Sequence, residues 1–161
     1  MKNVGSLDQT LLAPVRLRTT LEKIGKTEHF GSESVLFHAG DKNAGVYLVC
    51  SGRVQLEVPG VPQLSRAFSA GSILGLPSAF SEKPYSLTAV AATESEVVHV
   101  SKKEFLDLMK DEPDLCREAT DILSREVTFI MSALRGQRAQ AVSEALPSAA
   151  TNSVRRRAVN G

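Results

Sequence analysis

Closely spaced glycines constrain the fold of this chain more than any other feature. Eight of its eleven glycines lie between Gly25 and Gly75, where they separate short apolar runs. The runs that we predict to be strands are residues 34–38, 46–50, 53–58, 64–68, 87–91 and 96–100. Many short strands with frequent turn signals are typical of an antiparallel sandwich or barrel, and not of a parallel sheet with intervening helices.

Two of these glycines predict specific turns. Gly40 lies between Ala39 and Asp41, and Gly52 lies between Ser51 and Arg53. In both places a positive φ costs glycine little. All eight Phe and Tyr residues fall within residues 30–129, so we expect the aromatic part of the core to come from the middle of the chain.

Helices are predicted on both sides of the strands. Residues 11–24 carry Leu17 and Leu21 at helical spacing, which predicts a short amphipathic helix. Ser101 and Glu104 fit a capping box that would begin a second helix. A third should begin within residues 111–114, where proline is tolerated in the first turn and acidic residues favour the positive end of the helix dipole.

The third predicted helix carries an unusually wide apolar face. One stripe consists of Cys116, Leu123, Val127, Ile130 and Leu134, and the other of Leu115, Ala119, Ile122, Phe129 and Ala133. The whole face could pack on the helix's own barrel. Alternatively, one stripe packs on the barrel and the other on a second copy of the helix. The sequence leaves both interpretations open.

The end of the chain differs in composition from the rest. Residues 135–161 hold five Arg and one acid, a net charge of +4, so the preceding residues carry −3 out of the total of +1. We expect the folded domain to cover residues 11–136, with residues 1–10 flexible. Residues 137–161 form a basic, low-complexity tail with too little apolar surface to order itself.

The compartment is predicted from what the sequence lacks. No apolar run approaches the roughly 18 residues of a membrane helix, and the start of the chain has no signal-peptide pattern. A cytoplasmic protein with no membrane contact is the expectation. Cys50 and Cys116 are predicted to be reduced packing residues, although a disulfide between them stays possible from the sequence.

One segment carries a family resemblance. Residues 37–54, FHAGDKNAGVYLVCSGRV, resemble the opening strands of cyclic nucleotide-binding domains of the catabolite activator and FNR type. Residues 70–75 resemble the approach to the family's phosphate-binding cassette, 98–105 its last strand running into the B helix, and 111–115 the entry to its long C helix. The resemblance covers roughly residues 11–136. It implies a mainly β fold, a jelly-roll barrel (an antiparallel double-stranded β-helix) with an N-terminal helix, a B helix and a C helix.

The ligand-binding part of the resemblance is incomplete. Family members that bind cyclic AMP or cyclic GMP have a Glu for the ribose and an Arg for the phosphate in the cassette. Here Leu76 and Tyr85 fall near those places, and Ile130 and Met131 fall where relatives present hydroxyls to the purine. Losing two charged hydrogen bonds of about 1.5–3 kcal/mol each weakens binding by roughly two to four decades. We therefore predict that cyclic AMP is not bound at physiological concentration, and that no cofactor is needed.

A degenerate pocket is still expected at the cassette. Its predicted lining is Gly75, Leu76, Ser78, Ala79, Tyr85, Ser86, Leu87 and Thr88. The hydroxyls there could receive a small anion or polar ligand. We favour the alternative that they cap a short helix starting near Ser78 and satisfy local backbone groups. Glu82 and Lys83 lie just beyond and are interpreted as a solvated pair.

Catalysis and DNA binding are not predicted. The three histidines, His29, His38 and His99, lack metal-ligand spacing. A cupin-type metal site with His38, Glu57 and His99 therefore ranks last among the interpretations. Haem ligation through Cys50 or His38 stays open. No catalytic motif or metal site is identified. About 25 residues follow Gly136, too few for a helix-turn-helix, so no sequence-specific DNA binding is expected. The arginines at 155–157 are interpreted as a solvated tail.

The prediction is therefore a stand-alone regulatory or sensory domain and not an enzyme. It would dimerise through a C-helix seam made of Leu123, Val127, Ile130 and Leu134. Its partners would be a second copy and an unknown small ligand or protein. The alternative is a scaffold or adaptor with no small-molecule ligand, and a cupin-like metal enzyme is the third possibility.

Overall fold

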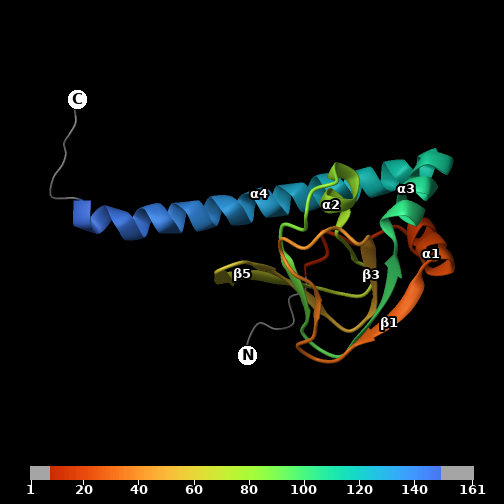
Figure 1. Ribbon diagram of the computed structural model, residues 1–161, viewed down its shortest axis with the longest axis horizontal. Helices are drawn as coiled ribbons and strands as arrows, with labels where there is room; N and C mark the ends of the chain where they lie inside the picture. Colours follow the sequence, from red (N-terminus) through yellow and green to blue (C-terminus); the bar gives the residue numbers. More distant parts are fainter. Residues whose placement is uncertain (1–7, 150–161) are drawn as a thin grey trace.

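Two antiparallel sheets face each other, and a long helix runs across one side of them (Figure 1). The computed structural model describes residues 8–149, with side chains described for all of these except residues 62–64, 133–134 and 136–149. The helices are α1 Val15–Ile24, α2 Leu76–Ser81, α3 Lys102–Asp111 and α4 Pro113–Ala149. The strands are β1 Lys26–Phe30, β2 Val35–Phe37, β3 Val46–Ser51, β4 Val54–Val58, β5 Val61–Phe68, β6 Ile73–Leu74, β7 Thr88–Ala91 and β8 Ser95–Val100.

The strand order confirms the predicted fold class. One sheet has the order β1-β8-β3-β6 and the other β2-β7-β4-β5, and all of these strand pairs are antiparallel. The sheets with their flanking helices form the expected jelly-roll fold. Gly40 and Gly52 both adopt positive φ, at 93° and 83°, as the two predicted turns require.

Two strands were not predicted. β1 has the sequence KTEHF, with no alternation of apolar residues, because it is an edge strand that pairs only with β8. β6 is two residues long and too short to give a periodic signal. The other six strands lie within one to three residues of their predicted bounds.

The core lies between the sheets and under the helices. Along β4, Val54, Leu56 and Val58 are buried, whereas Gln55 and Glu57 between them are half-buried. This alternation is typical of a strand with one face on the core. The largest fully buried side chains are those of Phe68, Phe105, Leu11, Leu17, Leu21, Leu48, Leu56, Ile73, Leu74, Leu76 and Ile122.

The helix starts follow the predicted capping chemistry with one difference. Ser101 Oγ accepts the backbone N–H of Glu104 at 3.2 Å, so Ser101 is the N-cap of α3. The carboxylate of Glu104 accepts the hydroxyl of Ser101 at 3.1 Å, instead of its backbone N–H. α4 begins at Pro113, within the predicted range.

The two stripes of α4 have different surroundings. Leu115, Ala119, Ile122 and Phe129 are buried against the barrel. In contrast, Val127 is 41% exposed and lies on the other stripe, with Met131 beside it at 49%. The whole apolar face is therefore not covered by the chain's own barrel. The side chains of Ala133 and Leu134 lie outside the described ones.

Both ends of the described chain differ from the expected domain limits. Asp8, expected to be flexible, donates its backbone N–H to the Ala67 carbonyl at 3.0 Å and pairs with Arg66 at 3.2 Å. At the other end, α4 continues through Gly136 to Ala149. Residues 137–149 are rich in Ala and Gln, which favour helix without burying apolar surface. Residues 1–7 and 150–161, including the three arginines, lie outside the described residues.

Cys50 and Cys116 are both free thiols and half-buried, and burial raises the pKa of the Cys50 thiol. Among the helices of residues 8–149, none is long and apolar enough to cross a bilayer.

Candidate functional site

A small pocket lies where α4 crosses the segment from Gly75 to Leu87, which we call the cassette. The lining residues are Phe37, Leu56, Gly75, Pro77, Ser78, Tyr85, Ser86, Leu87, Glu126 and Ile130. The cavity measures about 20 Å³, room for about one water-sized group. Of the predicted pocket residues, Leu76 and Ala79 are instead fully buried in the core, and Thr88 lies outside the lining.

Glycine is required at the start of the cassette. Gly75 is the N-cap of α2 with φ 93°. A Cβ at this position would lie 3.1 Å from the Gly45 carbonyl oxygen, so a side chain would be strained both in conformation and in contact. The helix therefore begins at Leu76, before the predicted start near Ser78. The Leu76 side chain is fully buried, and it places no charge in the pocket.

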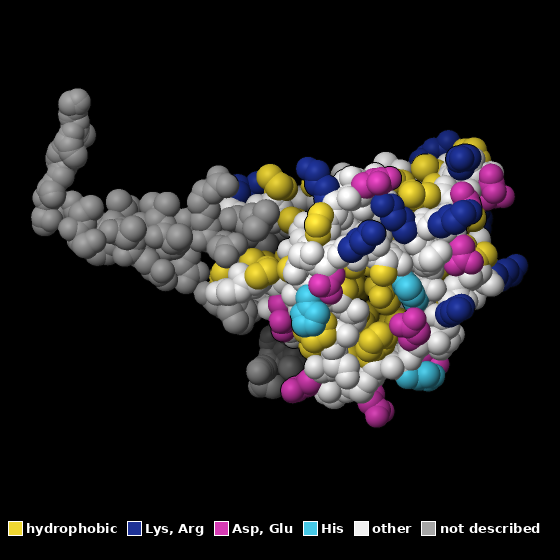
Figure 2. Space-filling view, viewed as in Figure 1, with side chains coloured by type: hydrophobic (Ala, Val, Ile, Leu, Met, Phe, Trp, Pro, Cys, Tyr) yellow, Lys and Arg dark blue, Asp and Glu magenta, His cyan; other side chains and the backbone are white. Residues whose placement is uncertain are grey.

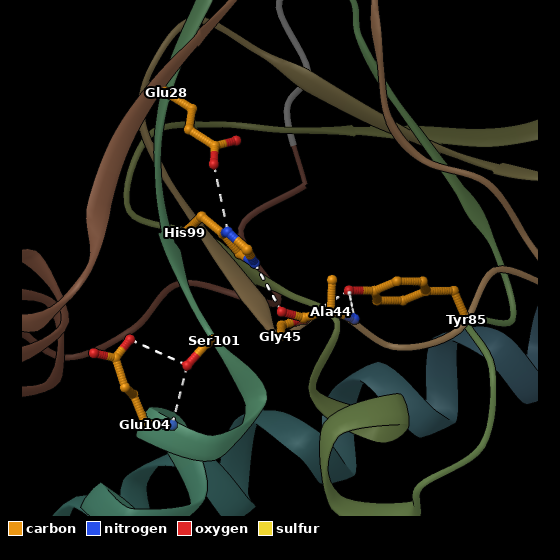
Figure 3. A network of polar contacts seen from close by, with 7 residues as sticks. All are labelled: Glu28, Ala44, Gly45, Tyr85, His99, Ser101 and Glu104. Carbon is orange, nitrogen blue, oxygen red and sulfur yellow. Dashed lines mark hydrogen bonds and ion pairs between the residues drawn. The ribbon is translucent and has the colours of Figure 1, made fainter.

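Tyr85, near the place of the family's Arg, binds the chain itself. Its hydroxyl donates to the Gly45 carbonyl at 2.8 Å and accepts the Ala44 N–H at 3.0 Å (Figure 3). Its ring stacks on Phe37, with centroids 3.9 Å apart. Burial raises the pKa of Tyr85, although the hydrogen bonds with Ala44 and Gly45 oppose this shift. The side chain is thus a neutral clamp on residues 44–45.

The predicted hydroxyls also serve the local backbone. Ser78 Oγ donates to the Lys83 carbonyl, and Thr88 Oγ1 accepts the Ala39 N–H at 2.9 Å. The hydroxyls of Ser78 and Thr88 thus satisfy backbone groups, as the favoured alternative expected. Its other part, that a hydroxyl caps this short helix, is wrong, because the N-cap of α2 is Gly75 and no side chain caps it. Glu82 has a 75% exposed side chain and pairs with Lys102 at 3.5 Å, outside the pocket.

Glu126 is the single Asp, Glu, Lys or Arg residue in the lining, and it was not predicted from the sequence. Glu126 is 3% exposed. Its Oε2 accepts the Gly75 N–H at 3.4 Å, whereas its Oε1 is buried without a hydrogen-bond partner. Burial raises the pKa of Glu126 to about 8, although the nearby backbone N–H groups of Gly75 and Leu76 act in the other direction. At pH 7 the carboxyl is therefore mostly protonated.

A signal for Glu126 exists in the sequence. The buried stripe of α4 runs through Ile122 and Phe129, and position 126 lies four residues after the first and three before the second. Residues at these spacings share one helix face. A carboxyl on that face must be buried when the stripe packs on the barrel.

A polar network continues from Tyr85 to the surface of the barrel (Figure 3). His99 Nε2 lies 2.8 Å from the Ala44 carbonyl oxygen, and Nδ1 lies 3.4 Å from Glu28 Oε2. The His99 ring also stacks on Tyr47, with centroids 4.6 Å apart. The segment of residues 44–45 is therefore fixed from both sides, by His99 and by Tyr85.

The other candidate ligands do not come together as a metal site. His38 lies in a turn in which its N–H donates to Asp41 Oδ2 at 3.0 Å. Among residues 8–149, no group of three or more His, Cys, Asp or Glu side chains could hold a metal ion. The proposed set of His38, Glu57 and His99 thus lacks the geometry of a metal centre.

A second, open groove lies at the far end of β1 and β8 from α1. His29, Glu94 and Glu96 contribute its charges, and His29 pairs with Glu96 at 3.3 Å. Figure 2 shows acidic and imidazole side chains around the lower part of the barrel, whereas Lys and Arg gather toward the helices. Neither hollow of the barrel described here has a Lys or Arg in its lining.

The family model for the cyclic nucleotide-binding domain matches residues 27–112, more than half of the chain. No curated protein sequence matches significantly.

Several solved structures share the fold. The catabolite activator protein of Thermus thermophilus is 20% identical with a TM-score of 0.62, over 78% of this chain and 60% of its own length. A protein of a cyclic-GMP-dependent pathway in bacterial phytopathogenesis is 17% identical with a TM-score of 0.63, over 75% of this chain and 96% of its own. The c-di-GMP responsive regulator CLP of Xanthomonas campestris is 16% identical with a TM-score of 0.63, over 80% and 65%.

Proposed function

The chain belongs to the cyclic nucleotide-binding domain family, and we propose that it is a regulatory domain that does not bind cyclic AMP in the usual way. One observation supports this proposal above the others. The lining of the cassette pocket contains no Lys or Arg and a single carboxyl, that of Glu126 from α4, in a cavity of about 20 Å³. A cyclic phosphate would find no cation in the lining.

Electrostatics disfavours an anion in this pocket. A cyclic phosphate bound without a charge-assisted hydrogen bond loses about 1.5–3 kcal/mol for each bond that relatives make. Above the pKa of Glu126, about 8, the carboxylate would also repel it. The backbone N–H of Gly75, which could donate to an anion, already donates to Glu126.

The proposed signal passes through α4. Glu126 and Ile130 both line the pocket and both belong to this helix. Any group that enlarges the pocket must therefore shift α4 relative to the cassette, or move these two side chains. Differential affinity for the two positions of the helix is what would couple pocket occupancy to an output.

The output we propose is a change in a dimer formed through α4. Val127 and Met131 are exposed, and Leu123 and Ile130 beside them are half-buried. A second copy of the helix would cover this stripe, as expected for an apolar seam. Leu134 belongs to the predicted seam, but its side chain is not among the described ones.

Light scattering tests this seam. We expect the wild-type chain to be a dimer, and the variant with Val127→Asp and Met131→Asp to be a monomer. Both positions are exposed in the single chain, so the variant should keep the far-ultraviolet circular dichroism of the wild type. Thr128→Asp, on an exposed polar position of the same helix, is the matched control and should remain dimeric. A dimeric double variant would overturn the seam.

A scaffold or adaptor without a small-molecule ligand is the second candidate. The observation in its favour is the size of the cavity, which holds no more than about one water-sized group. Native mass spectrometry of the purified chain distinguishes the two, because a sensor would carry a small molecule through a gentle purification. A cytoplasmic location and the absence of catalysis remain predictions from the sequence.

A further inference from the structure

The hydrogen-bond donors of the cassette pocket are already engaged. The hydroxyl hydrogen of Ser78 goes to the Lys83 carbonyl, and that of Tyr85 goes to the Gly45 carbonyl. The N–H of Gly75 goes to Glu126 Oε2. Among the side chains of the lining, the hydroxyl of Ser86 and the protonated carboxyl of Glu126 are left to donate, and once Glu126 is ionised its carboxylate offers only acceptor oxygens.

One of those acceptors has no partner. Glu126 is only 3% exposed, and its Oε1 is buried without a hydrogen-bond partner. A buried acceptor without a donor is rare in folded proteins and calls for an explanation. The charged form of this carboxyl is also disfavoured, because burial raises its pKa to about 8. A ligand with positively charged N–H donors would give Oε1 a hydrogen-bond partner and would also stabilise the ionised carboxylate.

The size and the walls of the pocket restrict this ligand further. A cavity of about 20 Å³ holds one water-sized group, such as an ammonium group. Phe37, Leu56 and Leu87 form apolar walls, which suit an alkyl chain. The mouth lies beside exposed Ser86 and half-exposed Ile130, so such a chain could lead out to solvent. A hard metal ion would instead need a shell of oxygen ligands.

We propose that the cassette pocket binds the ammonium group of a small primary amine, with Glu126 Oε1 as its acceptor. This inference rests on the proposed function, because it names a ligand class for the same regulatory pocket. It reverses the charge preference that the family's anionic ligands imply. Binding and ionisation of Glu126 are then linked, since the ammonium group stabilises the carboxylate.

Nuclear magnetic resonance on the labelled full-length chain tests the proposal. The probe is ethylammonium chloride at concentrations up to about 100 mM, because a ligand of three non-hydrogen atoms reaches roughly millimolar affinity at best. The readouts are the side-chain carboxyl carbon of Glu126 and the amide signals of Gly75 and Leu76. We expect saturable shifts and a lowered pKa of Glu126. The apparent affinity should rise about tenfold per pH unit up to pH 8 and then level off.

Two variants decide which carboxyl is responsible. Glu126→Gln should lose at least tenfold in affinity for ethylammonium and lose the pH dependence. Glu118→Gln is the matched control, because Glu118 lies on the same helix and also has a buried, unpartnered Oε1. It should bind as the wild type does.

The outcomes separate this proposal from the proposed function. Absence of saturable shifts, or equal binding by Glu126→Gln, overturns the amine site but leaves the α4 dimer and the lack of cyclic AMP binding untouched. The same shifts with potassium chloride would show a monovalent-cation site and overturn the amine. Competition by sodium acetate would show an anion site and overturn it as well.

Discussion

Glu126 connects α4 to the cassette through a carboxyl whose charged form is poorly stabilised. It lies on α4, and it reaches the first N–H groups of the cassette at Gly75. Since the N–H of Gly75 lies 3.4 Å away and no cation lines the pocket, the charged form is poorly compensated. The stability of the domain must therefore depend on pH at this residue.

The first prediction concerns Glu126→Gln. The pKa of Glu126 rises from 4.5 when unfolded to about 8 when folded, so between these values the native state binds more protons than the unfolded state. The free energy of unfolding then falls with rising pH, by up to about 1.4 kcal/mol per unit. Gln keeps the shape without the charge. In urea denaturation at pH 8, the free energy of unfolding of the variant should exceed that of the wild type by a few kcal/mol, on the order expected from linkage. At pH 4 the two free energies should differ little.

Glu118→Gln, a change of the same kind on the same helix, is the matched control variant. If wild type and Glu126→Gln have the same pH dependence between pH 4 and pH 8, the carboxyl is not buried as described.

Tyr85 gives a second residue-level prediction. Tyr85→Phe keeps the ring on Phe37 but removes the hydroxyl that contacts Ala44 and Gly45. We expect a loss of about 1–3 kcal/mol in the free energy of unfolding, because the Ala44 N–H loses its acceptor in a part-buried place. Tyr47→Phe, at the neighbouring ring of β3, is the control and should cost less. Equal losses for the two variants would contradict the clamp.

For single residues, the sequence predicts which charges are missing from the cassette more readily than which contacts the side chains there make. The missing charges at Leu76 and Tyr85 could be seen from the family resemblance alone. That Tyr85 binds the loop at residues 44–45 depends on a contact across 40 positions of sequence, for which no local pattern exists. Glu126 could have been found, since its spacing from Ile122 and Phe129 places it on the buried stripe.

At the scale of elements, the capping of α3 is open to a direct test. Ser101→Ala removes the hydroxyl that accepts the Glu104 N–H and donates to the Glu104 carboxylate. A loss of about 1 kcal/mol in the free energy of unfolding is expected. Ser124→Ala, exposed in the interior of α4, should change stability by less than half of that. A fully stable Ser101→Ala variant would show that the cap does not matter.

Elements with a strong local signal were the predictable ones. The six strands bounded by glycine-containing turns and the starts of α3 and α4 follow from spacing and capping residues. β1 and β6 escaped prediction because pairing with β8 and β3, and not their own sequences, makes them strands. α4 extends past Gly136 because its residues there favour helix. The prediction of an unordered tail considered only how much apolar surface these residues could bury.

At the scale of the whole molecule, the fold positions three parts around one small cavity. The barrel supplies apolar walls, the cassette supplies backbone N–H groups and hydroxyls, and α4 supplies the single carboxyl. The jelly roll and its family could be predicted from the sequence. The small size of the pocket could not, because it results from the packing of Tyr85, Glu126 and Phe37 from three distant segments.

The most direct test of the account is calorimetric titration of the full-length chain with cyclic AMP and cyclic GMP at neutral pH. We expect neither nucleotide to bind with a Kd below about 0.1 mM, because the lost charged contacts weaken binding by roughly two to four decades. Stoichiometric binding of either nucleotide with a low-micromolar Kd would contradict it.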